Sequence, residues 1–226
     1  MGEQRYVTLL TSLPYHGRLF GARQTPLSRF QLNKRLAWLT PEDAATLESM
    51  ESLLRWSRNL LLETDAGFLD QAKAVIDNID NPLLVDILKT RLEMRTLVAA
   101  LRKRTLGHPA PASKDAWGYG RWLQIMQNHW QEPDFGLGQI YPWIIDAERL
   151  MRRGDTLGLE RTFMNRAWRH LARCGAGHYF DFEAVVIYVL RWDLIDRWTR
   201  YDEEEAQKRI TGLTEAGLGN YQQMYQ

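Results

Sequence analysis

The stretch NPLLVDILKTRLEMRTLVAALRKRTLG, residues 81–107, decides the fold class of this 226-residue chain. Asn81 and Pro82 form a helix-start signal, because asparagine caps the free N–H groups of a first turn and proline fits the first helical position. Gly107 closes the stretch in the manner of a C-terminal glycine. The pattern predicts one helix of about seven turns, and we expect a mainly α-helical fold.

Further helix signals lie on the N-terminal side of this stretch. The segment 26–39, PLSRFQLNKRLAWL, carries leucines and a phenylalanine at helical spacing. Thr40 and Pro41, followed by two acidic residues that suit the helix dipole, predict a helix that runs toward Leu62. Residues 68–79 form a third amphipathic segment. Because the loops between these elements are short, we expect a multi-helix bundle with antiparallel neighbours.

The N-terminal segment YVTLLTSL, residues 6–13, is where a strand is predicted. Its residues are β-branched and apolar, and Pro14 stops them. This composition favours a short strand or an extended packing arm. The sequence contains no internal repeat of fixed period that would indicate a repeat architecture.

A proline-containing linker at 108–113, HPAPAS, divides the chain. The helical segments predicted after it are 113–130, 141–153, 156–174 and 180–201, with a short acidic helix after Asp202. Asp155 is the predicted N-cap of the helix 156–174. The chain therefore consists of an N-terminal helical half, residues 1–108, and a C-terminal helical half, residues 109–226, or it forms one fused helical domain.

Composition and charge place the chain among ordinary globular proteins. Apolar residues make up 45% and charged residues 25% of it, and a net charge of +1 gives no reason to expect nucleic acid as a partner. The single cysteine, Cys174, fits a reducing compartment, and no apolar run reaches the roughly 20 residues of a membrane span. We expect a cytoplasmic protein without direct membrane insertion, with peripheral attachment to the inner face of the cytoplasmic membrane as the alternative.

The common catalytic and nucleotide-binding motifs are missing from the sequence. It contains neither a P-loop nor a GxGxxG motif after a strand, and neither HExxH nor GxSxG occurs. A thiol at the C-terminal end of a helix faces the negative end of the helix dipole, which raises its pKa and disfavours Cys174 as a nucleophile. We therefore expect a chain that is not itself an enzyme and that takes no cofactor and no small-molecule substrate.

One spacing resembles a metal site, at His170, Cys174 and His178. On a continuous helix, residues four apart share a face, and two imidazoles with a thiolate can bind zinc. Gly175 and Gly177 interrupt that helix, however, and no fourth ligand lies close in the sequence. We therefore interpret His170 as a helix-face residue and Cys174 as a buried last-turn thiol, and expect no metal.

Basic residues dominate the block 149–173, which carries seven bases and two acids. Helical spacing puts Arg166, Arg169 and Arg173 on one face, and Arg152 and Arg153 lie nearby in the sequence. These five arginines are the predicted partner-binding residues, because such a stripe can dock an acidic protein surface. A solvated face, pairing with the acidic block 42–80, and contact with phosphates are the alternative interpretations.

Four blocks of the sequence together resemble a bacterial family of uncharacterised proteins, the DUF2764 type, encoded among V-type ATPase subunits. The blocks are YVTLLTSLP, TPLSRFQLNKRLAWLTPED, NPLL…LKTRLEMRTLVAALRKRTLG and HYFDFEAVVIYVLRWDLIDRW, which together span most of residues 6–200. The family's position there is that of the C subunit, the central-stalk adaptor also called subunit d. This chain is much shorter than that three-lobed helical funnel, so no residue-level contact is carried over.

The resemblance implies a non-catalytic helical subunit that couples the central rotor shaft of a V-type ion-translocating ATPase to the membrane proteolipid ring. Its partners would be protein subunits of that ATPase. Independently of the family, abundant arginine and tryptophan favour an interaction protein. A general helical protein–protein interaction module of unknown pathway is the alternative, and an enzyme is a third hypothesis.

Overall fold

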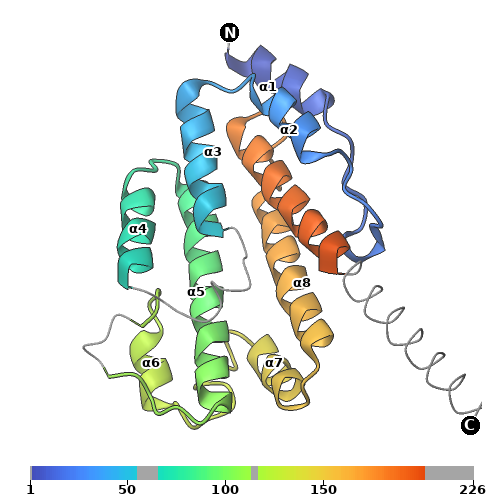
Figure 1. Ribbon diagram of the computed structural model, residues 1–226. Helices are drawn as coiled ribbons and strands as arrows, with labels where there is room; N and C mark the ends of the chain where they lie inside the picture. Colours follow the sequence, from blue (N-terminus) through green and yellow to red (C-terminus); the bar gives the residue numbers. More distant parts are fainter. Residues whose placement is uncertain (1, 55–65, 113–116, 202–226) are drawn as a thin grey trace, which may run out of the picture.

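The computed structural model describes residues 2–54, 66–112 and 117–201 (Figure 1). Within these ranges the regular structure is helical and contains no strand, so the predicted mainly α-helical fold is confirmed. The labelled elements are α1 (Gly2–Thr11), the short 3-10 helix η1 (Leu19–Gly21), α2 (Arg29–Leu36), α3 (Pro41–Leu54), α4 (Ala66–Asp77), α5 (Pro82–Thr105), α6 (Leu123–Asn128), α7 (Trp143–Arg152) and α8 (Thr156–Cys174). A further helix covers 182–201.

The long helix α5 runs through the centre of the structure (Figure 1). Elements α3, α7 and α8 each pack against it, and its buried residues include Leu84, Leu88 and Leu101. The predicted cap is present, since Asn81 Oδ1 accepts hydrogen bonds from the backbone N–H groups of Leu83 and Leu84, at 3.0 and 3.2 Å. The local signal that opens this helix therefore also sets the position of the central packing element.

Asn81 also links two distant helices, because its Nδ2 donates to Glu183 Oε1 at 2.6 Å. We expect Asn81→Ala to lower the free energy of unfolding by about 1–2 kcal/mol, through loss of the cap and of this link. Asn81→Ser retains a capping oxygen and loses only the link, so its effect should be smaller. Urea denaturation of the three proteins checks this, and equal losses in both variants would contradict a capping role.

The prediction of a strand over 6–13 is wrong, because residues 6–11 belong to α1. The apolar side chains follow a helical period: Leu9 is fully buried, while Tyr6 and Leu10 pack partly buried against the same core. The threonine hydroxyls fit the helix by donating to carbonyls four residues back, as Thr11 Oγ1 does to Val7 at 2.7 Å. Burial at every third or fourth residue therefore outweighs the β propensity of these side chains.

Helix α2 begins later than the predicted 26–39 segment. Its N-cap is Ser28, whose Oγ accepts from the Gln31 N–H, while the Gln31 side chain accepts from the Ser28 N–H at 3.0 Å. This reciprocal capping box fixes the start of the helix at Arg29. Helix α3 begins at Pro41 as predicted, with Thr40 Oγ1 accepting from the backbone of Asp43 at 3.1 Å. Its predicted continuation toward Leu62 lies outside the described residues.

The helix predicted over 113–130 is shorter than expected, because only Leu123–Asn128 form α6. Residues 117–122 instead lie extended or in a turn against α5. The Tyr119 N–H donates to Thr96 Oγ1 at 2.8 Å, and a Cβ at Gly118 would come within 2.4 Å of Thr96 Cγ2. Close backbone approach to α5 therefore replaces helical hydrogen bonding here. The predicted cap Ser113 lies outside the described residues, and so does the short helix predicted after Asp202.

Helix α8 begins at its predicted cap, since the Gly158 N–H donates to Asp155 Oδ1 at 2.8 Å. The last described helix, 182–201, is tied to the N-terminal part by two long-range hydrogen bonds. Trp192 Nε1 donates to the Leu27 carbonyl at 2.8 Å, and the Tyr188 hydroxyl donates to the Pro14 carbonyl at 2.9 Å. The N-terminal loop is thus held against the C-terminal helix.

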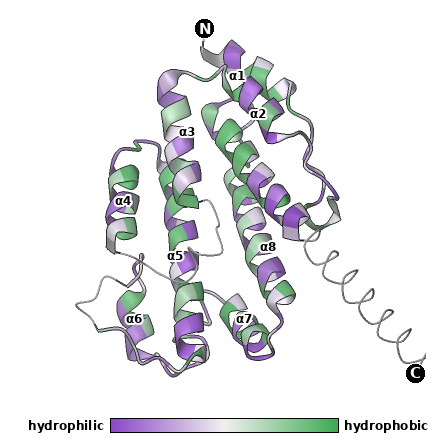
Figure 2. Cartoon of the chain, viewed as in Figure 1, coloured by the Kyte–Doolittle hydropathy of each residue, from purple (hydrophilic) through white to green (hydrophobic). Residues whose placement is uncertain are grey.

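Buried side chains from both sides of the 108–113 linker belong to one continuous core. Five of the tryptophans anchor it, namely Trp117, Trp130, Trp143, Trp192 and Trp198. Helix α8 carries both hydrophobic and hydrophilic residues (Figure 2). Its buried residues form one face in the core, and the other face lies outside it. None of the described helices combines the length and the apolarity needed to cross a membrane.

Candidate functional site

Helix α8 presents two features that bear on function, and the first is a row of arginines. Its buried side includes Phe163, Ala167 and Leu171, and it packs against α5 and α7. Arg169 and Arg173 are exposed and Arg166 is half-buried. We call these three residues the α8 arginine face.

The positive charges of the α8 arginine face act on one another. Burial lowers the pKa of the Arg166 guanidinium, and the nearby charges of Arg169 and Arg173 lower it further. Within residues 2–54, 66–112 and 117–201, no carboxylate forms an ion pair with any of the three. The described structure thus leaves a cationic face that an acidic surface can bind.

The structure does not bring all five predicted partner-binding arginines together. Arg152 ends α7 and Arg153 follows it, at the N-terminal end of α8 (Figure 1). The axial rise from Thr156 to Arg166 is about 15 Å. Arg152 also forms an ion pair with Glu148, one turn before it. The two residues are exposed, but they lie apart from the α8 arginine face.

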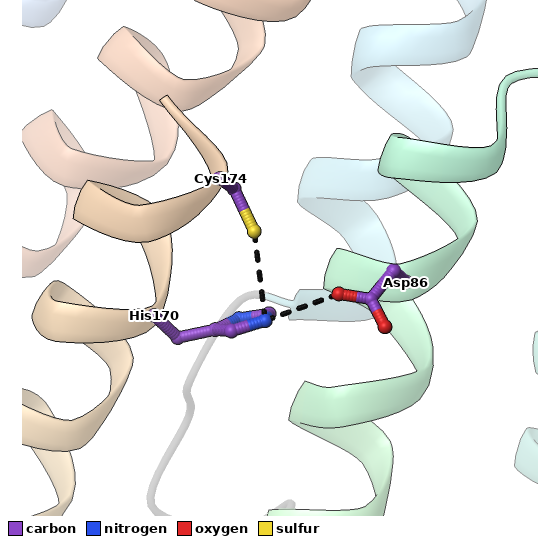
Figure 3. Close-up of side chains that lie close together, drawn as sticks. All are labelled: Asp86, His170 and Cys174. Carbon is purple, nitrogen blue, oxygen red and sulfur yellow. Dashed lines mark hydrogen bonds and ion pairs between the residues drawn. The ribbon is translucent and has the colours of Figure 1, made fainter. Parts of the chain in front are cut away.

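The second feature is a cluster formed by Asp86 of α5 with His170 and Cys174 of α8 (Figure 3). His170 Nε2 lies 3.2 Å from Asp86 Oδ2 and 3.5 Å from Cys174 Sγ. The His170 side chain is 12% exposed and Asp86 is 63% exposed, while Cys174 is buried. The cluster therefore has two sheltered ligand atoms and one open side.

Burial sets the protonation states in this cluster. Burial lowers the pKa of His170, and the positive charges of Arg173 and Arg91 lower it further. Asp86 acts in the opposite direction and raises this pKa, but burial has the larger effect. Burial raises the pKa of the Cys174 thiol, and the carboxylate of Asp86 raises it further. The direction agrees with the sequence-based expectation for Cys174, although burial is the main cause. Near neutral pH the imidazole and the thiol are both uncharged, which disfavours an activated nucleophile.

His178 does not join His170 and Cys174, because the chain turns at Gly175–Gly177. It lies instead in a second group with Asp181 and Glu183, where its Nδ1 is 2.8 Å from Asp181 Oδ2. Asp181 Oδ1 accepts from the Ala184 N–H at 2.8 Å and so caps the following helix. Sequence reasoning missed Asp86 altogether, because it lies 84 positions before His170 on another helix.

No family model matches the chain, and neither a curated protein nor a solved structure does. The resemblance to the V-type ATPase-associated family thus rests on the four sequence blocks quoted above.

Proposed function

We propose that this chain is a non-catalytic adaptor subunit of a bacterial V-type ion-translocating ATPase, coupling the central rotor shaft to the membrane proteolipid ring. The single observation that carries the proposal is the α8 arginine face, a cationic surface on a helix that the core holds in place. The sequence blocks that resemble the ATPase-associated family supply the identity of the partners. The chain takes no part in ATP hydrolysis in this proposal.

The α8 arginine face suits a protein partner with surface carboxylates. A guanidinium is planar and binds a carboxylate through two parallel hydrogen bonds. Three guanidinium groups on one face can therefore bind several acidic side chains of a partner. Crowding among Arg166, Arg169 and Arg173 is unfavourable in the free chain, and an acidic partner would relieve it. Complementary charge of this kind raises the association rate and sets specificity.

Reversing the α8 arginine face tests the proposal. Tagged wild-type protein, expressed in its own bacterium, should recover rotor subunits of the ATPase from native membranes, as identified by mass spectrometry. We expect the triple variant Arg166→Glu, Arg169→Glu and Arg173→Glu to recover at least about tenfold less, because like charges then meet the acidic partner. A matched control reverses three other exposed bases, Arg18, Arg23 and Lys34, and should recover normal amounts.

Substitutions at exposed positions, here all but the half-buried Arg166, typically change stability by less than about 0.5 kcal/mol each. Folding of both triple variants is checked by circular dichroism. Unchanged recovery by the folded α8 variant would overturn the assignment of this face. A deletion strain whose membranes still hold a fully coupled ATPase would overturn the adaptor function. Specific recovery of an unrelated acidic protein through the same face would replace it with the general interaction module.

A further inference from the structure

Three different ligand types converge where α5 meets α8. Asp86 offers a carboxylate oxygen, His170 an imidazole nitrogen and Cys174 a sulfur, and these atoms all lie within 4.8 Å of one another (Figure 3). Oxygen, nitrogen and sulfur from these side chains are the ligands that zinc takes in proteins. We propose that Asp86, His170 and Cys174 bind one zinc ion and so join α5 to α8.

The separations between the ligand atoms fit a tetrahedral ion. Zinc lies about 2.0–2.1 Å from a histidine nitrogen, about 2.3 Å from a thiolate and about 2.0–2.2 Å from a carboxylate oxygen. At tetrahedral angles those bond lengths put nitrogen about 3.3 Å from oxygen and about 3.6 Å from sulfur. The observed values are 3.2 Å from His170 Nε2 to Asp86 and 3.5 Å to Cys174. The Asp86 oxygen and the Cys174 sulfur lie within 4.8 Å of each other, against about 3.6 Å around a tetrahedral zinc ion, so this pair has to close by roughly 1 Å at most.

Hydrogen bonding in this cluster centres on a single nitrogen atom. The same atom, His170 Nε2, faces both the Asp86 carboxylate and the Cys174 sulfur. A protonated Nε2 can donate strongly to the carboxylate and only weakly, in a bifurcated bond, to the sulfur, so the metal-free cluster contains at most one strong hydrogen bond. In a catalytic relay, moreover, the acid would hold the other ring nitrogen, and His170 Nδ1 is buried with no hydrogen-bond partner in the described structure.

Charge and access also fit a zinc ion. The thiol loses its proton to solvent on binding, so one thiolate and one carboxylate neutralise the divalent cation. Thiolate ligation favours zinc over magnesium or calcium. Asp86 is 63% exposed, which leaves an entry path and room for water as a fourth ligand.

Metal titration of chelator-treated full-length protein tests the site. We expect one equivalent of Zn²⁺ to bind, and a melting temperature raised by about 5–10 °C at about a 100-fold excess over Kd. Co²⁺, used as a probe, should give the intense visible bands of a tetrahedral ion and a thiolate charge-transfer band. Cys174→Ala should abolish the charge-transfer band and weaken binding at least about tenfold, as lost ligation does.

Three further variants complete the test. Asp86→Asn changes an exposed residue and should weaken Zn²⁺ binding even if Cys174→Ala fails to fold. His108→Ala removes an exposed histidine outside the cluster and should bind like the wild type. Absence of stoichiometric Zn²⁺ binding would overturn the proposal. So would binding that survives Asp86→Asn and Cys174→Ala but is lost in His178→Ala, because the ion would then occupy the group of His178, Asp181 and Glu183.

Discussion

Replacing Phe135 with alanine is expected to lower the free energy of unfolding by about 3–5 kcal/mol, the range found for a buried aromatic ring. The ring is fully buried. Its centroid lies 5.3 Å from that of Trp130, and the Arg104 guanidinium carbon lies 4.1 Å from the same centroid. Truncation removes apolar contact and leaves a cavity between α5 and the segment that follows α6. Urea denaturation monitored by tryptophan fluorescence measures the loss.

Phe30→Ala is the matched control, because it makes the same chemical change at a ring that is 68% exposed. We expect it to change stability by less than about 0.5 kcal/mol. Phe135 also has a φ of +55°, a left-handed conformation that is unfavourable for a residue with a side chain. Burial of the ring and the hydrogen bond from Arg104 to the Pro133 carbonyl, at 2.9 Å, hold this turn. Equal effects of the two variants would contradict the assigned role of Phe135.

Acidification is expected to destabilise the fold through His16. Burial, reinforced by the positive charge of Arg191, lowers the pKa of His16 from its ordinary value of 6.5 to about 4. The folded state therefore binds fewer protons than the unfolded state between these pH values. The contribution of neutral His16 is complete above pH 6.5 and is lost as pH falls from 6.5 toward 4, by about 3 kcal/mol in total.

His16→Phe isolates this contribution. The phenyl ring can occupy the place of the imidazole, which lies with its centroid 3.9 Å from the Tyr188 ring and 6.1 Å from the Trp168 ring. Because phenylalanine does not titrate, the stability of the variant should fall less between pH 6.5 and 4 than that of the wild type. Removing the exposed His108 instead, with His108→Gln, should leave the pH dependence unchanged. Parallel curves for wild type and His16→Phe would refute the role of His16.

Helix starts could be predicted from the sequence where the signal is local. Thr40, Asn81 and Asp155 each supply a side-chain oxygen to a backbone N–H two or three residues later. The few residues around each cap therefore determine where the helix begins. Residues 6–13 and 117–122 were predicted wrongly because packing decides them. Leu9 is buried by helices distant in sequence, and the Gly118 backbone lies against Thr96. Such contacts depend on the tertiary structure, and local secondary-structure propensity carries no information about them.

The distinction between local signals and tertiary contacts also applies to charged residues and to the candidate sites. Asp196 and Arg200 form an ion pair at 2.7 Å, as expected for an acid and a base four residues apart on one helix. Arg197 forms an ion pair with Glu160 of α8 at 2.8 Å, a contact between residues of two different helices. The shared face of Arg166, Arg169 and Arg173 likewise follows from helical periodicity. The approach of Asp86 to His170 requires the relative positions of α5 and α8, which no pattern within either helix specifies.

The hydrogen bonds that tie Leu27 and Pro14 to the helix 182–201 constrain the order in which the chain can fold during synthesis. Trp192 follows Leu27 by 165 residues, and Tyr188 follows Pro14 by 174 residues. At about 5–20 residues per second, the ribosome adds the missing helix on the order of 10–30 s after the N-terminal loop. Leu27, which is buried in the folded protein and bonded to Trp192, lacks this partner until then. The emerging chain therefore exposes part of this apolar surface to chaperones until the helix 182–201 has left the ribosome.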